Sequence, residues 1–225
     1  MTASLLLAVV LQEKPFVHST TEQYTRLEVH GFTVFVSPAA IADRKASEAA
    51  LAMLDTKLAE VGRIVPKPAF DDLAKVKIWV ERNNPENKGA VYHPSSEWLR
   101  LNGYNKDKEN GVEIGSVYSF VEWGTKTQPM MVLHELAHAY HHQVLGYDER
   151  RVTAAFDAAK ATGRYESVLF VSGGNKRHYG LTNAMEYFAE SSEAYFGMND
   201  FYPFNRWQLL SFDRAMYEAL VATWG

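Results

Sequence analysis

The stretch Pro129-Met-Met-Val-Leu-His134-Glu135-Leu-Ala-His138-Ala-Tyr-His141-His142 is the part of the sequence around which the rest is organised. It carries the pattern His-Glu-x-x-His inside an apolar run that is compatible with a helix. Residues four apart lie on one face of an α-helix, so the imidazoles of His134 and His138 can reach a single zinc ion. Glu135 follows His134 by about 100° around the helix axis and can flank the same site. The stretch therefore predicts a helix, ending near Gly146, that bears two metal ligands and a base.

The composition limits the classes of protein to which the chain can belong. Its 225 residues are 47% hydrophobic and 13% aromatic, which suits one folded domain with a buried core. The net charge is −4 and the Lys and Arg residues are scattered, so we expect no nucleic-acid partner. The absence of cysteine excludes disulfides, Cys-ligated zinc and thiol catalysis. Metal ligands must therefore come from His, Asp and Glu.

The N-terminus contains an apolar run, Leu5-Leu-Leu-Ala-Val-Val-Leu11, that is similar to the hydrophobic core of a secretory signal peptide. It is too short to span a bilayer, which takes about 20 apolar residues, so we expect no stable membrane insertion. No Lys or Arg precedes it and no small-x-small cleavage site follows, so a buried first strand or helix is the alternative. We expect a secreted or periplasmic protein, otherwise a cytoplasmic one. Residues 1–20 are then an N-terminal segment and residues 21–225 the domain.

Hydrophobic periodicity along the chain predicts strands in the first half and helices in the second. The expected strands cover residues 24–30, 32–36, 75–80, 97–101 and 112–123. The expected helices, besides the one at 129–145, cover residues 40–62, 148–162, 182–196 and 205–223. In the last helix we expect a buried face made of Trp207, Leu209, Leu210, Phe212, Met216, Leu220 and Trp224. This order of elements predicts a single α+β domain with an N-terminal mixed sheet and a mostly helical C-terminal half.

A catalytic zinc usually takes three protein ligands, so a third must be found. The extended pattern His-Glu-x-x-His-x-x-Gly-x-x-His fails, because His141 and Val144 occupy its Gly and last His positions. The later helix offers glutamates with spacing i, i+4 and i+7 on one face, namely Glu186, Glu190 and Glu193.

Each of these glutamates has a role and an alternative. We expect Glu186 to be the third ligand, although it could instead form a capping box with Asn183. We expect Glu190 to accept a hydrogen bond from a ligand histidine, since ligating histidines need such partners; a core salt bridge is the alternative. Glu193 ranks after Glu190 for that role.

The remaining histidines of this region have more ordinary interpretations. His141 and His142 continue the predicted helix, where we expect solvation or a structural hydrogen bond. His178 lies in a loop beside Tyr179 and could contact substrate, although a loop histidine is usually just exposed.

These residues carry a resemblance to a known family. His134-Glu135-Leu-Ala-His138 followed by Glu186-Tyr-Phe-Ala-Glu190 resembles the gluzincin metallopeptidases. The stretch Tyr179-Gly-Leu-Thr-Asn-Ala-Met-Glu186-Tyr-Phe-Ala-Glu190 is similar to the active-site stretch of the anthrax lethal factor catalytic domain and its relatives. The resemblance implies a zincin-like fold, Glu186 as the third zinc ligand, and Tyr179 as a residue that stabilises the transition state. An ordinary packed tyrosine is the alternative for Tyr179. The resemblance covers about residues 130–197 and implies no toxin-like targeting.

The function expected from the sequence is that of a zinc-dependent metalloendopeptidase that acts as a monomer on a peptide or protein substrate. Glu135 would take a proton from a water that zinc activates. The predicted strand 112–123, with Gly115 and Ser116, would be the edge strand along which substrate lies.

Two other functions stay open. The first is a non-catalytic zinc-binding or interaction domain, in which His93, His141 or His178 closes the metal site as a fourth ligand. The second is a zinc amidase that acts on non-protein amides such as cell-wall peptides.

Overall fold

The computed structural model describes residues 17–225. The apolar run at residues 5–11, on which the secretion prediction depends, lies outside the described residues. Within residues 17–225, no helix is both long enough and apolar enough to cross a membrane.

Five strands within residues 17–225 form one mixed sheet in the order β1-β2-β3-β5-β4. β2, β3 and β5 are parallel to one another in its centre, whereas β1 and β4 pair antiparallel at its two edges. The predicted hairpin is confirmed: His30 and Gly31 form its two-residue turn with φ of 49° and 90°, as a hairpin turn with two positive φ angles requires. The strands are β1 (Thr25–Val29), β2 (Phe32–Val36), β3 (Ile78–Val80), β4 (Ala90–Tyr92) and β5 (Val112–Ile114).

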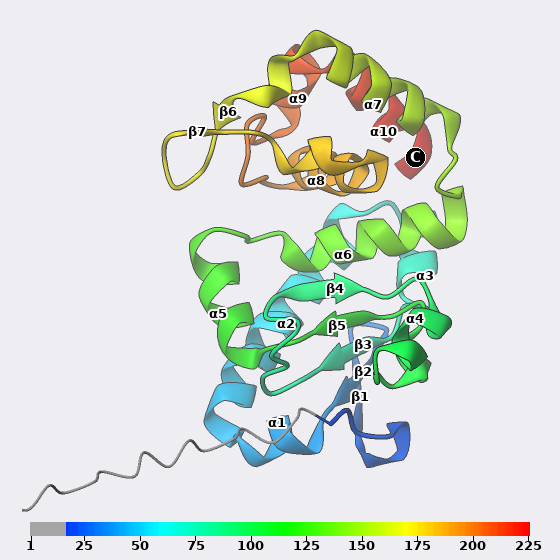
Figure 1. Ribbon diagram of the computed structural model, residues 1–225, viewed down its shortest axis with the longest axis vertical. Coiled ribbons are helices and arrows are strands. Elements are labelled where there is room, and N and C mark those ends of the chain that lie inside the picture. The colour runs from blue at the N-terminus through cyan, green and yellow to red at the C-terminus, as the bar shows by residue number, and fades with distance from the viewer. Residues whose placement is uncertain (1–16) are drawn as a thin grey trace, which may run out of the picture.

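Helices cover one face of this sheet and form the C-terminal half of the molecule (Figure 1). This arrangement confirms the predicted single α+β domain. A small hairpin of β6 (Val168–Leu169) and β7 (Asn175–Lys176) projects from the helical half. The helices are α1 (Pro38–Ala42), α2 (Arg44–Ile64), α3 (Lys67–Leu73), α4 (Ser96–Leu101), α5 (Val117–Lys126), α6 (Met131–Tyr140), α7 (Arg150–Thr162), α8 (Ala184–Phe196), α9 (Arg206–Phe212) and α10 (Arg214–Trp224).

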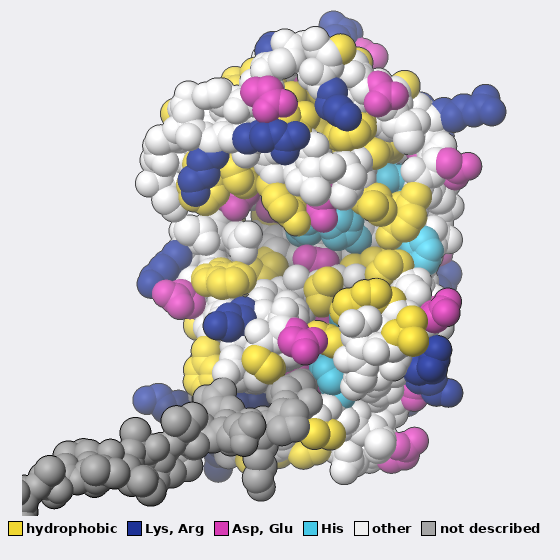
Figure 2. Space-filling model, viewed as in Figure 1, with side chains coloured by type: hydrophobic (Ala, Val, Ile, Leu, Met, Phe, Trp, Pro, Cys, Tyr) yellow, Lys and Arg dark blue, Asp and Glu magenta, His cyan; other side chains and the backbone are white. Residues whose placement is uncertain are grey.

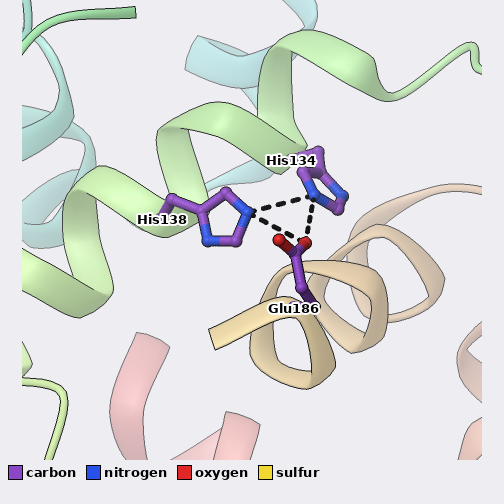
Figure 3. Close-up of side chains that lie close together, drawn as sticks. All are labelled: His134, His138 and Glu186. Carbon is purple, nitrogen blue, oxygen red and sulfur yellow. Dashed lines mark hydrogen bonds and ion pairs between the residues drawn. The ribbon is translucent and has the colours of Figure 1, made fainter. Parts of the chain in front are cut away.

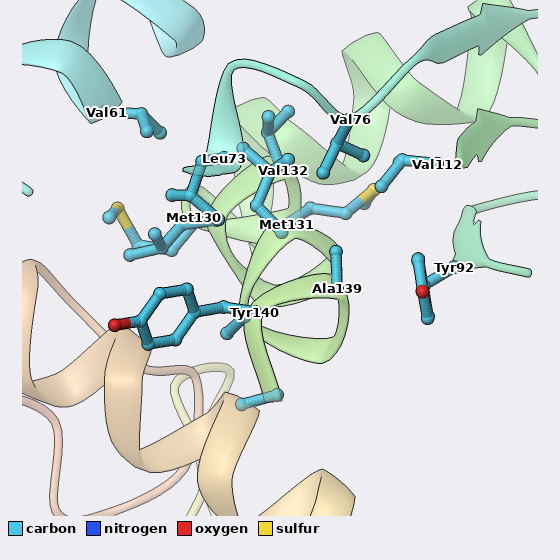
Figure 4. Close-up of a cluster of buried hydrophobic side chains, with 14 of the residues drawn as sticks. Val61, Leu73, Val76, Tyr92, Val112, Met130, Met131, Val132, Ala139 and Tyr140 are labelled. Carbon is cyan, nitrogen blue, oxygen red and sulfur yellow. The ribbon is translucent and has the colours of Figure 1, made fainter. Parts of the chain in front are cut away.

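The hydrophobic core joins the sheet to α6, the helix of the His-Glu-x-x-His pattern. Alternate residues of β2, namely Phe32, Val34 and Val36, are fully buried, as expected for a strand with one face on the core. Figure 4 shows side chains from α2, α3, β5 and α6 meeting around the start of α6. The helix α6 is therefore held by packing on the sheet side and against α8 on the other (Figure 1).

One predicted strand is wrong and another is too long, because serine side chains start helices there. Residues 97–101 lie in α4, where Ser95 Oγ accepts a hydrogen bond from Trp98 N. The predicted strand 112–123 ends at Ile114, and Ser116 Oγ then accepts from Ser119 N at the start of α5. In both cases the serine satisfies a backbone donor in the first helical turn, which favours a helix over continued extension.

The predicted last helix over 205–223 is two helices that meet at Asp213. The Asp213 carboxylate accepts from Met216 N at the start of α10 and from the hydroxyls of Tyr165 and Tyr187. Trp207, expected in the core, is 76% exposed on α9, whereas Leu209, Met216, Leu220 and Trp224 are buried as expected. The bend at Asp213 changes which residues face inward, since α9 and α10 have different axes.

A network of buried charges supports the sheet face that α6 does not cover. Lys108 Nζ lies 2.7 Å from Glu81 Oε1 and 2.9 Å from Glu113 Oε2, and all three side chains are buried. His93 Nε2 lies 3.0 Å from the same Glu113 oxygen. Burial alone would raise the pKa of Glu113, but His93 and Lys108 lower it to about 2. The Glu113 carboxylate therefore stays ionised because its partners are buried with it.

Removal of the Lys108 charge should expose the dependence of the sheet on this network. Lys108→Met leaves Glu81 and Glu113 buried without their cation, and we expect a loss of about 3–5 kcal/mol in the free energy of unfolding. Lys106→Met is the matched control, because Lys106 lies in the same turn but is exposed. Urea denaturation of both variants measures the difference, and equal stabilities would contradict the proposed role.

Candidate metal centre

The helix α6 places two histidines on the side that faces α8. Its residues are buried on almost every side, which explains the continuous apolar run in the sequence. A π-helical turn, His141–Leu145, continues α6 to Gly146, whose φ of 81° ends the helix where the sequence predicted.

The start of α8 brings the third candidate ligand to the same place. Asn183 Oδ1 accepts hydrogen bonds from Met185 N and Glu186 N, each at 2.9 Å, and so begins the helix. The carboxylate of Glu186 points instead at the two histidines (Figure 3). Asn183 therefore acts as the helix cap while Glu186 is available to a metal.

The three side chains converge with the spacing of metal ligands (Figure 3). His134 Nε2 and His138 Nε2 lie 3.1 Å apart, and each lies 3.2 Å from Glu186 Oε2. Tetrahedral zinc with bonds of about 2.0–2.1 Å separates its ligand atoms by about 3.3 Å. Two imidazoles and one carboxylate are also a donor set that zinc accepts. The residues present therefore fit zinc.

The surroundings favour the ionised form of Glu186, and the three side chains line an open cavity. Burial would raise the pKa of Glu186, but its contacts with His134 and His138 outweigh burial and lower the pKa. The three side chains lie at the floor of a cavity of about 350 Å³, here called the metal cavity. Figure 2 shows this hollow between the sheet half and the helical half, with histidine side chains inside it.

Glu135 also lines the metal cavity, and the sheet edge holds its carboxylate. The Tyr92 backbone N–H donates to Glu135 Oε2 at 2.7 Å. Tyr92 belongs to β4, the edge strand beside α6, whereas β5 lies between β3 and β4. The expected substrate strand, residues 112–123, is thus wrong, because its β5 part has neighbours on both sides. The free edge at the cavity belongs to β4.

Glu193, rather than Glu190, accepts the hydrogen bond from the ligand histidine. His134 Nδ1 lies 2.6 Å from Glu193 Oε1 but 3.8 Å from Glu190 Oε1. At about 100° per residue, position i+7 lies only about 20° from the direction of Glu186, whereas position i+4 lies about 40° away. Glu186 and Glu193 therefore reach the two nitrogens of one imidazole, and the expected role of Glu190 is corrected.

Glu190 is a buried carboxyl with little hydrogen bonding. Within residues 17–225, its Oε2 atom has no hydrogen-bond partner, and His178 Nδ1 lies 3.9 Å away. That nitrogen already accepts from Gly180 N, so it carries no proton to donate. Burial, and next the charge of Glu193, raise the pKa of Glu190 well above its usual value. The surroundings of Glu190 therefore favour its protonated form.

Besides Tyr92 of β4, two tyrosines line the metal cavity, of which the sequence predicted one. Tyr179 is 48% exposed, and burial and the Glu186 charge raise its pKa, so its phenol keeps its proton. Tyr147 was not predicted; burial and then Glu186 raise its pKa to about 12. Its position directly after Gly146, where the ligand helix ends, was the only signal in the sequence. Either hydroxyl can donate a hydrogen bond to a group bound in the cavity.

The other histidines have structural positions outside the cavity lining. His178 is buried and begins a short turn by accepting from Gly180 N, so it is neither exposed nor turned toward substrate. His142 Nδ1 lies 2.8 Å from the Tyr92 hydroxyl. His93 contacts Glu113 on the other face of the sheet.

His141 is buried without a hydrogen bond, which corrects the expectation of solvation or a structural hydrogen bond. Within the described part of the chain, neither of its nitrogens has a partner, and its ring packs against Tyr147 and Phe188. Burial lowers its pKa to about 4. His141 is therefore a neutral packing residue between α6 and α8.

Comparison of the chain with protein-family models, curated proteins and solved structures gave no match. The resemblance to gluzincins therefore depends on the quoted residues alone and stays a prediction.

The difference between Glu193 and Glu190 can be measured as zinc affinity. We expect Glu193→Gln to weaken zinc binding about 10–100-fold, because His134 loses the acceptor that orients its ring. Glu190→Gln, the matched control one turn away, should change affinity much less because Glu190 Oε1 lies 3.8 Å from His134 Nδ1 and makes no hydrogen bond to it. Competition with a chromophoric chelator gives both constants. A larger loss for Glu190→Gln would restore the role expected from the sequence.

Acid should destabilise the protein partly through His141. Its pKa is about 4 when folded and 6.5 when unfolded. The unfolded state thus binds the proton first, and stability falls as pH drops from 6.5 toward 4. Between about pH 7 and pH 4.5 this amounts to roughly 2–3 kcal/mol. His141→Leu removes the titrating group and should flatten the dependence by that amount, as measured by urea unfolding of metal-free protein. An unchanged slope would exclude His141 as the cause.

Proposed function

We propose that the protein is a zinc-dependent metalloendopeptidase, a hydrolase of the gluzincin type that resembles the lethal factor catalytic-domain-like family. One observation carries the proposal: three donor atoms from α6 and α8 lie 3.1–3.2 Å apart beside Glu135 at the floor of an open cavity. His134, His138 and Glu186 would hold the zinc. Zinc, when bound, lowers the pKa of water toward about 7 and polarises a carbonyl.

The residues around the metal cavity supply the rest of the chemistry. Glu135 takes a proton from the attacking water and returns it to the leaving amine. The Tyr92 N–H holds Glu135 Oε2, which leaves Oε1 for this exchange. The hydroxyl of Tyr179 donates to the carbonyl oxygen of the substrate as negative charge develops there. Glu193 keeps the His134 ring in the orientation that presents Nε2.

A catalytic role fits the cavity better than a purely structural metal site. A structural zinc is closed by four protein ligands, whereas three ligand atoms here meet at a cavity with room for substrate. His93, His141 and His178, the residues considered as a fourth ligand, are not part of the cavity lining. The free edge of β4 beside the metal cavity favours an extended peptide as substrate.

Replacement of the base should separate metal binding from hydrolysis. We expect Glu135→Gln to keep stoichiometric zinc and to lower kcat at least about 100-fold, because the amide cannot accept the proton. Metal analysis and cleavage of a peptide library measure the two properties on the same preparation. Full activity in Glu135→Gln would contradict the mechanism.

A matched variant and a second substrate panel complete this experiment. Glu186→Ala should lose both zinc and activity, since only two ligands remain. A panel of cell-wall muropeptides tests the amidase alternative. Hydrolysis of muropeptides without hydrolysis of any protein-derived peptide would replace the endopeptidase by an amidase.

A further inference from the structure

A second cavity adjoins the metal cavity across the edge strand β4. It measures about 560 Å³ and shares Val91, Tyr92 and Pro94 with the metal cavity. Three rings form part of its other walls: Trp98 and Tyr104 have ring centres 5.4 Å apart, and His93 stacks on Trp98. We call it the aromatic cavity, defined by Val91, His93, Pro94, Trp98 and Tyr104. The two cavities therefore meet along β4, and together they are called the cleft here.

The backbone of β4 offers hydrogen-bonding groups to this cleft. Gly89, Val91 and His93 are the positions that bond to β5. In a strand, neighbouring residues direct their backbone groups to opposite sides, so Ala90 and Tyr92 direct theirs away from β5. The bond from Tyr92 N to Glu135 confirms this direction. An extended segment that enters the cleft can thus pair with β4 at Ala90.

Pairing with β4 determines where the side chains of such a segment go. Successive side chains of a strand point to opposite faces of the sheet. One face of β4 carries α6 and the metal cavity, and the other carries Glu113, the cross-strand partner of Val91. A peptide side chain on the first face meets the metal cavity, and the next side chain meets the aromatic cavity.

The chemistry of the walls selects the side chain that fits. Trp98 is 50% exposed in a cavity whose walls also include Val91, Tyr92, Pro94 and Tyr104, with Glu86, Asn87, His93 and Ser95 as the polar residues. Among the described residues that line the two cavities, none is Lys or Arg, whereas Glu86, Glu135 and Glu186 are present. Acidic side chains would meet no cation there. Large aromatic side chains would remove both their own surface and that of Trp98 from water.

We propose that the aromatic cavity is a specificity pocket that binds a bulky aromatic side chain of an extended peptide paired with β4. The inference rests on the proposed function for the position of the reacting bond, but its binding step does not require catalysis. It assigns Trp98 as the residue that determines selectivity at that one peptide position.

The test uses the full chain loaded with zinc and carrying Glu135→Gln, so that peptides bind without being cut. A positional-scanning library of extended peptides is bound to this protein and to the same protein with Trp98→Ala. We expect Phe, Tyr and Trp to be preferred at one position, and Trp98→Ala to reduce that preference about tenfold there and nowhere else. Trp98→Phe should restore it, which separates ring contact from a general structural effect.

Trp207→Ala is the matched control, because Trp207 is an exposed tryptophan on α9 outside both cavities. It should leave the preference unchanged. The absence of any peptide binding, of an aromatic preference, or of a loss in Trp98→Ala would each overturn the inference. Selective binding by Glu135→Gln together with no cleavage by the wild-type zinc protein would support the pocket and contradict the proposed hydrolysis.

Discussion

The imidazole of His134 is held between two carboxylates of α8, and the rest of the site depends on this contact. Glu186 lies at Nε2 and Glu193 at Nδ1, so one ring connects α6 to two successive turns of the other helix. Carboxylates are costly to bury unless they are paired or bind a metal. The interface therefore tolerates Glu186 and Glu193 because of their contacts with His134, while burial raises the pKa of Glu190 and favours its protonated form.

Packing at the other end of α6 keeps the two helices at this distance. Tyr140 at the end of α6 stacks on Trp224 of α10, with ring centres 4.2 Å apart. Trp224 also stacks near Phe188 of α8, and its indole N–H donates to Ser192 Oγ. The last residues of the chain thus join the ligand helix to the helix of the third ligand. His141 fills the space between them and contributes a ring without any hydrogen bond.

The sheet contributes its edge to the cleft, and the buried charges on its far face support that edge. Tyr92 of β4 makes contacts through both its backbone and its side chain. Its backbone N–H donates to Glu135, and its hydroxyl contacts Asn110 Oδ1 and His142 Nδ1. On the other face of the sheet, Glu113 pairs with both Lys108 and His93. His93 also lines the aromatic cavity. The free edge of β4 thus lies beside the metal cavity, with its Tyr92 N–H on the Glu135 carboxylate.

The sequence by itself determined the features that depend on local geometry. His134, Glu135 and His138 follow from the helical repeat, and Glu186 follows from the start of a helix with acidic residues on one face. The β1–β2 hairpin and the helices α7 and α8 were likewise predicted. Their turns, caps and hydrophobic periodicity depend only on residues that are close together in the sequence. Tertiary structure alone decided which carboxylate meets His134 Nδ1, because the rotation of about 60° around the helix axis between Glu190 and Glu193 matters only once α6 is beside α8. It also decided that β4 rather than β5 is the free edge, since strand order depends on contacts between residues far apart in the chain.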